Sequence, residues 1–141
     1  MSDKEKVTVE WVSNMAFEAD VKGNKIMLDA EPNVGGGKRG APPKPLMLVA
    51  LGGCTGMDVI SILKKMRVDI EGFKVSVEGE LTGEHPRYFN KMHVIYEFTG
   101  KNLPLDKLQK AISLSEEKYC GVSAVYNKVM EITSEIKINE T

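Results

Sequence analysis

Cys54 and Cys120 are the only thiols in the sequence, and they are its first candidates for chemistry. Cysteine is among the residue types most often buried, so two inert core thiols are the simplest interpretation. Cys120 falls where one predicted helix ends and the next begins, and free N–H groups at a helix N-terminus favour a thiolate. Physical chemistry alone therefore ranks Cys120 as the more reactive thiol.

Cys54 lies within the stretch "ALGGCTGMDV", in the middle of a predicted helix. Each glycine in a helix interior costs about 1 kcal/mol relative to alanine, so the glycines here need a reason, either close packing or access to the thiol. Burial would disfavour the ionised form of Cys54, and Asp58, one helical turn later, would oppose a thiolate. A cation from elsewhere is therefore required. Lys38, Arg39 and Arg87 are the candidates; we expect Arg39 to fill this role, with Arg87 as the second choice.

Metal binding is the next kind of chemistry to consider, because His85 and His93 add two potential ligands to the cysteines. No pair of these residues has the short spacing typical of zinc sites, so the sequence predicts no metal site and no cofactor. The loop "GGGKRG" could hold an anion with its backbone N–H groups. It lacks the G-K-[ST] ending of a nucleotide-binding loop, so a mobile surface loop and a role beside the active site both remain open.

Length and composition indicate one ordinary globular domain, residues 1–141. With 19 basic and 20 acidic residues the net charge is −1, which gives no reason to expect nucleic acid as a partner. The N-terminus lacks the apolar core of a signal peptide, and the longest apolar run, Leu46–Leu51, is too short to cross a bilayer. Two cysteines without an export signal suit a reducing compartment. We therefore expect a cytoplasmic protein that does not associate with membranes.

The elements that must position these residues follow from hydrophobic periodicity and turn signals. Glu31–Pro45 has the glycines, prolines and cations of a loop. The expected strands are Val7–Val12, Met15–Val21, Lys25–Ala30, Gly72–Thr82, Asn90–Gly100 and Glu131–Glu140, and the expected helices are Leu46–Arg67, Leu105–Tyr119 and Cys120–Met130. This order predicts an α+β fold with an antiparallel sheet of about six strands and a long central helix.

The apolar residues of the Leu46–Arg67 helix occupy most of its circumference, which predicts burial on more than one side. One antiparallel sheet covers only one side of a helix. Either the other helices cover the rest, or a second copy of the chain does so in an obligate homodimer.

Three stretches of the sequence, "LGGCTGMDVISILKKMR", "EHPRYFNKMHVIYEFTGKNL" and "SEEKYCGVSAVYNKV", resemble the OsmC/Ohr family, and more closely its YhfA-like branch. The resemblance extends over nearly the whole chain from about Val7. It implies an intertwined homodimer with two long central helices and active sites at the subunit interface. The well-studied peroxidases of the family carry an arginine in the N-terminal strands, where this sequence has none, and a glutamate at a place that here falls on Lys44 or Pro45.

The resemblance also implies a thiol-dependent peroxidase that reduces organic hydroperoxides or hydrogen peroxide by a two-cysteine mechanism. In that mechanism Cys54 attacks the peroxide and becomes a sulfenic acid, and Cys120 resolves it as a disulfide that an external thiol reduces. The implied partners are a small peroxide, a thiol reductant and a second copy of the chain. The alternative is a non-catalytic module on the same fold that binds a small molecule or senses redox state.

Overall fold

The computed structural model describes residues 3–141, and the chain divides into two compact units with the boundary after Met47. The N-terminal unit contains an antiparallel sheet of three strands in the order β1 (Thr8–Ser13), β2 (Ala16–Val21) and β3 (Asn24–Leu28). Lys22 and Gly23 join β2 to β3 with positive φ angles of 52° and 84°. Positive φ at both central residues matches the twist of a tight hairpin. The three strands predicted before the loop Glu31–Pro45 are confirmed, and they form a meander.

The loop after β3 is organised by one buried carboxylate, that of Asp29, which is 2% exposed. Its oxygens accept hydrogen bonds from the backbone N–H groups of Ala30, Gly37 and Arg39 at 2.8–3.1 Å. The glycine-rich loop therefore does hold an anion, and the anion belongs to the chain itself. A Cβ at Gly36 or Gly40 would collide with backbone carbonyls of Ala30 or Met27, so both positions require glycine.

These N–H donors hold the pKa of Asp29 below its usual range, the Arg39 amide contributing most. The folded state thus favours the ionised carboxylate, which adds stability above about pH 4, and this contribution is lost as the pH falls through the lowered pKa. We expect Asp29→Asn to lower the free energy of unfolding at pH 7 and to reduce its loss between pH 7 and pH 3. Urea denaturation followed by circular dichroism measures both, with Asp69→Asn at an exposed position as the control. Equal pH dependence in Asp29→Asn and wild type would contradict this assignment.

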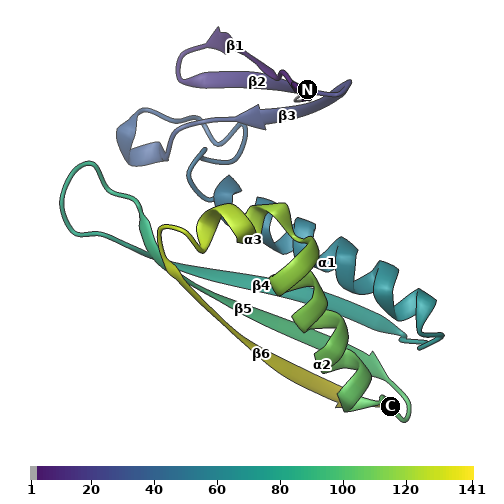
Figure 1. The fold of residues 1–141 in the computed structure, drawn as a ribbon. Helices are drawn as coiled ribbons and strands as arrows, with labels where there is room; N and C mark the ends of the chain where they lie inside the picture. Colours follow the sequence, from purple (N-terminus) through teal and green to yellow (C-terminus); the bar gives the residue numbers. More distant parts are fainter. Residues whose placement is uncertain (1–2) are drawn as a thin grey trace. The chain divides into compact units, whose positions relative to one another are not determined.

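The C-terminal unit places its helices on one face of a second three-stranded sheet (Figure 1). The strands lie in the order β4 (Gly72–Leu81), β5 (Phe89–Gly100) and β6 (Glu131–Glu140). The helices are α1 (Leu46–Lys65), α2 (Leu105–Leu114) and α3 (Gly121–Tyr126), with a π-helical turn, Ser115–Tyr119, between α2 and α3. Each helix and strand expected from the sequence is present, within a few residues at most of its bounds.

The core of this unit lies between the sheet and the helices. Alternate residues of β5, including Met92, Val94, Tyr96 and Phe98, are at most 1% exposed. Leu51, Val59 and Leu63 of α1 and Leu108 of α2 complete the core. The Phe73 and Phe98 rings stack at a centroid distance of 4.7 Å across paired positions of β4 and β5. This packing fixes α1 and α2 above the sheet and so positions the residues between them.

The α+β class is confirmed, but the strands are arranged differently from the prediction. They form two sheets of three strands rather than one of about six, and β5 and β6 are parallel. The chain leaves β5, crosses the sheet through α2 and α3, and returns in the same direction. A crossover of this kind produces parallel strands, whereas the short connection from β4 to β5 produces an antiparallel pair.

Helix α1 is buried along one stripe only, formed by Leu51, Thr55, Val59 and Leu63. Of its other apolar residues, Val49 is 64% and Met57 is 76% exposed. A Cβ on Gly52 would lie 3.2 Å from Val77, so this glycine permits close packing of α1 on β4. Part of the apolar surface of α1 is therefore uncovered within one chain.

The apolar run Leu46–Leu51 is only the first part of α1. The whole of α1, 20 residues, is long and apolar enough to cross a membrane by length and composition. A core helix of a globular protein meets the same criteria, and the buried stripe of α1 packs into the core described above.

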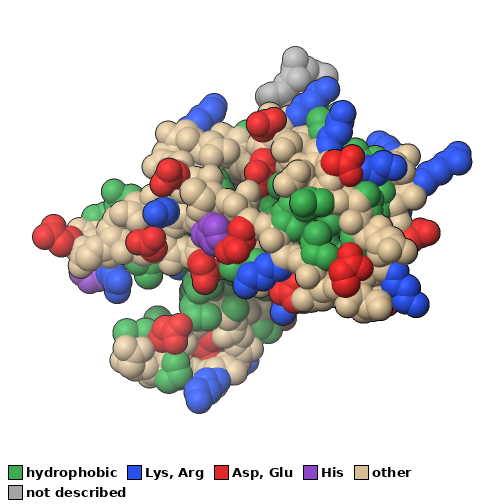
Figure 2. Space-filling model, turned by 90° about the horizontal axis from the view of Figure 1, so that it is seen from below, with side chains coloured by type: hydrophobic (Ala, Val, Ile, Leu, Met, Phe, Trp, Pro, Cys, Tyr) green, Lys and Arg blue, Asp and Glu red, His purple; other side chains and the backbone are tan. Residues whose placement is uncertain are grey.

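The surface charge is mixed. On the side of the molecule drawn in Figure 2, acidic and basic side chains are interspersed and no large area of one sign is present. This distribution agrees with the net charge of −1. A polyanion such as nucleic acid finds no basic patch on this side.

Candidate functional site

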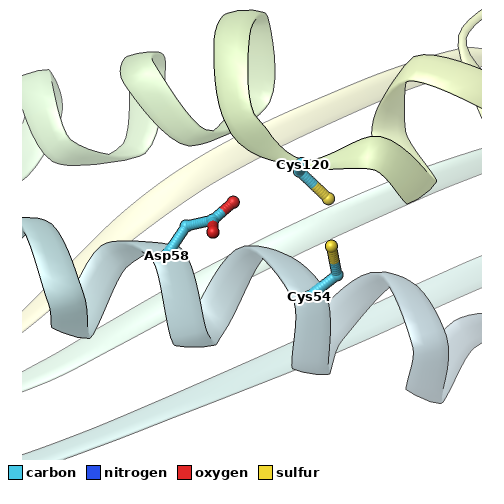
Figure 3. A group of neighbouring side chains, drawn as sticks. All are labelled: Cys54, Asp58 and Cys120. Carbon is cyan, nitrogen blue, oxygen red and sulfur yellow. The ribbon is translucent and has the colours of Figure 1, made fainter.

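Three side chains of the C-terminal unit converge between α1 and the start of α3. Cys54 and Asp58 project from α1 toward Cys120, which lies opposite them (Figure 3). The two sulfur atoms and a carboxylate oxygen of Asp58 all lie within 4.8 Å of one another. Both cysteines are free thiols, Cys54 half-buried and Cys120 buried. Two cysteines far apart in the sequence are thus brought together in the structure.

The π-helical turn determines where Cys120 lies. The backbone N–H of Cys120 donates to the carbonyl of Ser115 at 2.7 Å, which closes the wide turn. The chain then turns into α3, and Cys120 is its N-cap residue, with the Sγ atom accepting a hydrogen bond from the Ser123 N–H at 3.3 Å. π-helical turns are rare and frequently mark functional sites.

Two features of the Cys120 environment act on its thiol in opposite directions, the helix N-terminus and burial. The N-terminal N–H group is present, but Cys120 is only 3% exposed. Burial raises the pKa of the Cys120 thiol most, hydrogen bonds from the hydroxyl and the N–H of Ser123 lower it, and the neighbouring Cys54 raises it. The net direction is upward, because desolvation outweighs the hydrogen bonds at the helix terminus.

We therefore expect iodoacetamide to alkylate Cys54 at least about tenfold faster than Cys120 in the reduced native protein, because the reagent needs an accessible thiolate. Peptide mass mapping after short exposure at pH 7.5 measures the two rates. In urea both thiols are exposed, and the rates should become equal. Faster labelling of Cys120 in the native protein would contradict this order.

A chain of hydrogen-bonded, buried hydroxyl groups leads from the core to Asp58. The Ser115 hydroxyl donates to Asp58 Oδ2 at 3.0 Å and lies 2.7 Å from the hydroxyl of Thr55. Thr55 Oγ1 in turn lies 2.9 Å from the phenol oxygen of Tyr96, which donates to Glu116 at 2.8 Å. Ser115, Thr55 and Tyr96 are all 0% exposed. Burial is the main cause of the raised pKa of Tyr96, so its hydroxyl stays protonated and continues to donate. This chain holds Asp58 in one orientation.

The cations proposed from the sequence have other contacts. Arg39 lies in the N-terminal unit, where its guanidinium donates to the Ser13 hydroxyl at 2.6 Å. Arg87 donates to the backbone carbonyl of Thr82 within the β4–β5 loop. The role of Arg39 beside Cys54 remains a prediction. His93 contacts Thr133 and Glu135 at 2.7–2.8 Å, and neither histidine belongs to the cysteine cluster.

Sequence reasoning missed the hydroxyl chain, although one signal for it was present. Thr55 occupies the apolar stripe of α1 at the same four-residue spacing as Leu51 and Val59. A polar side chain at a core position requires a hydrogen-bond partner. Its partners, Tyr96 and Ser115, come from distant parts of the chain, and the sequence alone does not indicate which residues they are.

The fold and the paired thiols define an α+β protein with a candidate redox site. The chain belongs to the OsmC-like protein family, whose model matches residues 35–135. Protein YhfA of Escherichia coli (strain K12) is 32% identical over 131 residues, which are 92% of this chain and 95% of YhfA.

Solved structures agree with this assignment. A hypothetical protein from Aquifex aeolicus VF5 is 29% identical with a TM-score of 0.81, over 97% of this chain and 98% of that one. The organic hydroperoxide resistance protein OhrB of Bacillus subtilis has the same fold, with a TM-score of 0.67 at 17% identity over 94% and 96% of the two chains. These neighbours show the same fold over nearly the whole chain.

Proposed function

We propose that the protein is a thiol-dependent peroxidase in which Cys54 is the nucleophile and Cys120 the resolving thiol. The observation that carries the proposal is the convergence of the two sulfur atoms, within 4.8 Å, from separate helices. Cys54 is the more exposed thiol, and burial raises the pKa of Cys120. This division of roles suits a two-cysteine mechanism.

The proposed reaction balances in two steps. The Cys54 thiolate attacks one peroxide oxygen, so that an S–O bond forms, the O–O bond breaks, and the leaving alkoxide or hydroxide takes up a proton. The Cys120 thiol then attacks the sulfenic acid of Cys54, a disulfide forms and water leaves. An external thiol reduces the disulfide. Organic hydroperoxides and hydrogen peroxide both fit this scheme.

Arg39 is the proposed source of positive charge for the Cys54 thiolate. A cation within about 4–6 Å shifts the pKa of a neighbouring acid by roughly 1–3 units, more than a helix terminus supplies. Arg39→Ala should therefore slow the first step about tenfold or more while leaving the second step unchanged. An unchanged rate constant for the first step would remove Arg39 from the mechanism.

The experiment that tests the function is consumption of cumene hydroperoxide and hydrogen peroxide by the reduced protein with a dithiol reductant. We expect turnover that depends on both peroxide and reductant. A protein without turnover on either peroxide would instead favour the alternative of a binding or sensing module. We further propose that the two units form one OsmC-like domain in a cytoplasmic protein; the family match spans their boundary.

The proposed active form is a homodimer, because the C-terminal unit leaves an apolar groove uncovered. The groove has a volume of about 810 Å³ and lies along α1 and β4. Its lining includes Val49, Gly53, Met57, Ile60 and Phe73. Several of these residues are exposed apolar side chains, Val49 at 64% and Met57 at 76% among them. A second copy of the chain would bury them.

We expect wild-type protein to be dimeric at micromolar concentration in sedimentation equilibrium. Met57→Asp places a charge on an apolar residue that is 76% exposed within one chain, and it should weaken dimerisation by more than about 30-fold. Leu105→Asp, an equivalent change at the 46%-exposed start of α2, is the control. A folded wild-type monomer at that concentration, or Met57→Asp with wild-type affinity, would contradict the dimer.

A further inference from the structure

The carboxylate beside the two thiols has a charge that disfavours a thiolate. A peroxidase site should surround its nucleophile with cations, yet the neighbour that the structure brings to both sulfur atoms is Asp58. Asp58 is not turned away, because the Ser115 hydroxyl donates to its Oδ2 atom at 3.0 Å and fixes its direction. Two thiols and a carboxylate held together in this way form a set of donors for a cation.

We propose that the reduced protein binds one Zn²⁺ ion through Cys54, Cys120 and Asp58. Thiolate sulfur and carboxylate oxygen are both established ligands of Zn²⁺, at about 2.3 Å and 2.0–2.2 Å. Ligand atoms around one tetrahedral ion at those distances are roughly 3.5–3.8 Å apart. The three donor atoms already lie within 4.8 Å of one another, so binding requires side-chain movements of about an ångström.

Neighbouring residues hydrogen-bond to two of the three proposed ligands, Asp58 and Cys120. Ser115 orients Asp58 and is itself held by Thr55, whose hydroxyl also contacts Tyr96. Outer hydrogen bonds of this kind fix the direction of metal ligands and raise affinity. The Ser123 N–H does the same for the Cys120 sulfur. Thr55, Ser115 and Ser123 are at most 2% exposed.

A pocket on the surface opens beside Asp58. Asp58 lines a pocket of about 380 Å³ together with Ser61, Lys65, Leu114 and Tyr119. A zinc ion with three protein ligands keeps its fourth position for water or another small molecule. The pocket gives a small ion access to Asp58, the one proposed ligand among its lining residues.

Zinc binding and disulfide formation would exclude each other. On binding, each thiol releases its proton to solvent and keeps its electrons, so no oxidation occurs. Oxidation to a Cys54–Cys120 disulfide removes both sulfur ligands. The proposal uses the same side chains as the proposed peroxidase, but it does not depend on turnover, and each can fail while the other holds.

The test is titration of the reduced, metal-free protein with Zn²⁺ in competition with a chromophoric chelator, alongside Co²⁺ as a spectroscopic probe. We expect one Zn²⁺ per chain, submicromolar affinity and thiolate-to-cobalt charge-transfer absorption. Cys54→Ser and Cys120→Ser should each weaken binding at least about 100-fold, and Asp58→Asn about 10–100-fold. Asp69→Asn, at an exposed position outside the cluster, should bind as wild type does.

The titration would overturn the proposal if it showed no binding below micromolar Zn²⁺. Wild-type affinity for Zn²⁺ in Asp58→Asn, or in both cysteine variants, would overturn it as well. Circular dichroism establishes that each variant is folded. Wild-type protein oxidised to the disulfide provides a test without substitution, because it should lose Zn²⁺ binding and regain it on reduction. Retained binding in the oxidised protein would also exclude the site.

Discussion

Cys54→Ser should abolish peroxide consumption, with a loss of at least about 1,000-fold in the rate of the first step. A serine hydroxyl is a far weaker nucleophile than a thiolate at neutral pH, and the remaining thiol, Cys120, is buried with a raised pKa. Stopped-flow measurement of peroxide loss by the reduced protein gives this rate. Wild-type protein and Cys120→Ser are measured beside it.

Cys120→Ser separates attack from resolution. This variant should consume one equivalent of peroxide and then stop, leaving a sulfenic acid on Cys54 that dimedone traps. The opposite pattern, with Cys120 trapped as sulfenic acid in Cys54→Ser at the wild-type rate, would reverse the two roles. Equal slow reaction of both thiols, at the rate of free cysteine, would exclude the peroxidase.

Leu108→Ala should lower the free energy of unfolding by about 2–5 kcal/mol, because it removes a 0%-exposed side chain from the core and leaves a cavity. Leu108 anchors α2, which leads directly into the π-helical turn and Cys120. The same change at Leu105, three residues earlier and 46% exposed, should alter stability by no more than about 0.5 kcal/mol. Urea denaturation of the two variants makes the comparison, and equal losses would contradict the described core.

The sequence was sufficient for the elements but not for their pairing. Alternating apolar residues in β5 and helical spacing in α1 are local patterns, and both predicted the observed structure. The parallel pairing of β6 with β5 depends on where the chain returns to the sheet after α2 and α3. No local sequence pattern indicates that position. The π-helical turn at Ser115–Tyr119 likewise reads as a continuation of α2, because its residues keep helical composition.

The site was also predictable only where local sequence indicates it. The cysteines were found by residue type and by resemblance to the family, and Asp58 by its position one turn after Cys54. The hydroxyl chain behind Asp58 joins α1, β5 and the π-helical turn, so it exists only after the core has packed. The ranking of Cys120 as the more reactive thiol considered its helix terminus but not its burial, which sequence alone does not show.

The central claim is that Cys54 and Cys120 form a redox couple, and intact mass after one equivalent of hydroperoxide tests it most directly. We expect loss of both thiols, a mass decrease of two hydrogens and a Cys54–Cys120 peptide after non-reducing digestion. All three changes should reverse with a dithiol. Unchanged mass with both thiols still titratable, or oxidation of Cys54 alone beyond sulfenic acid, would contradict the account.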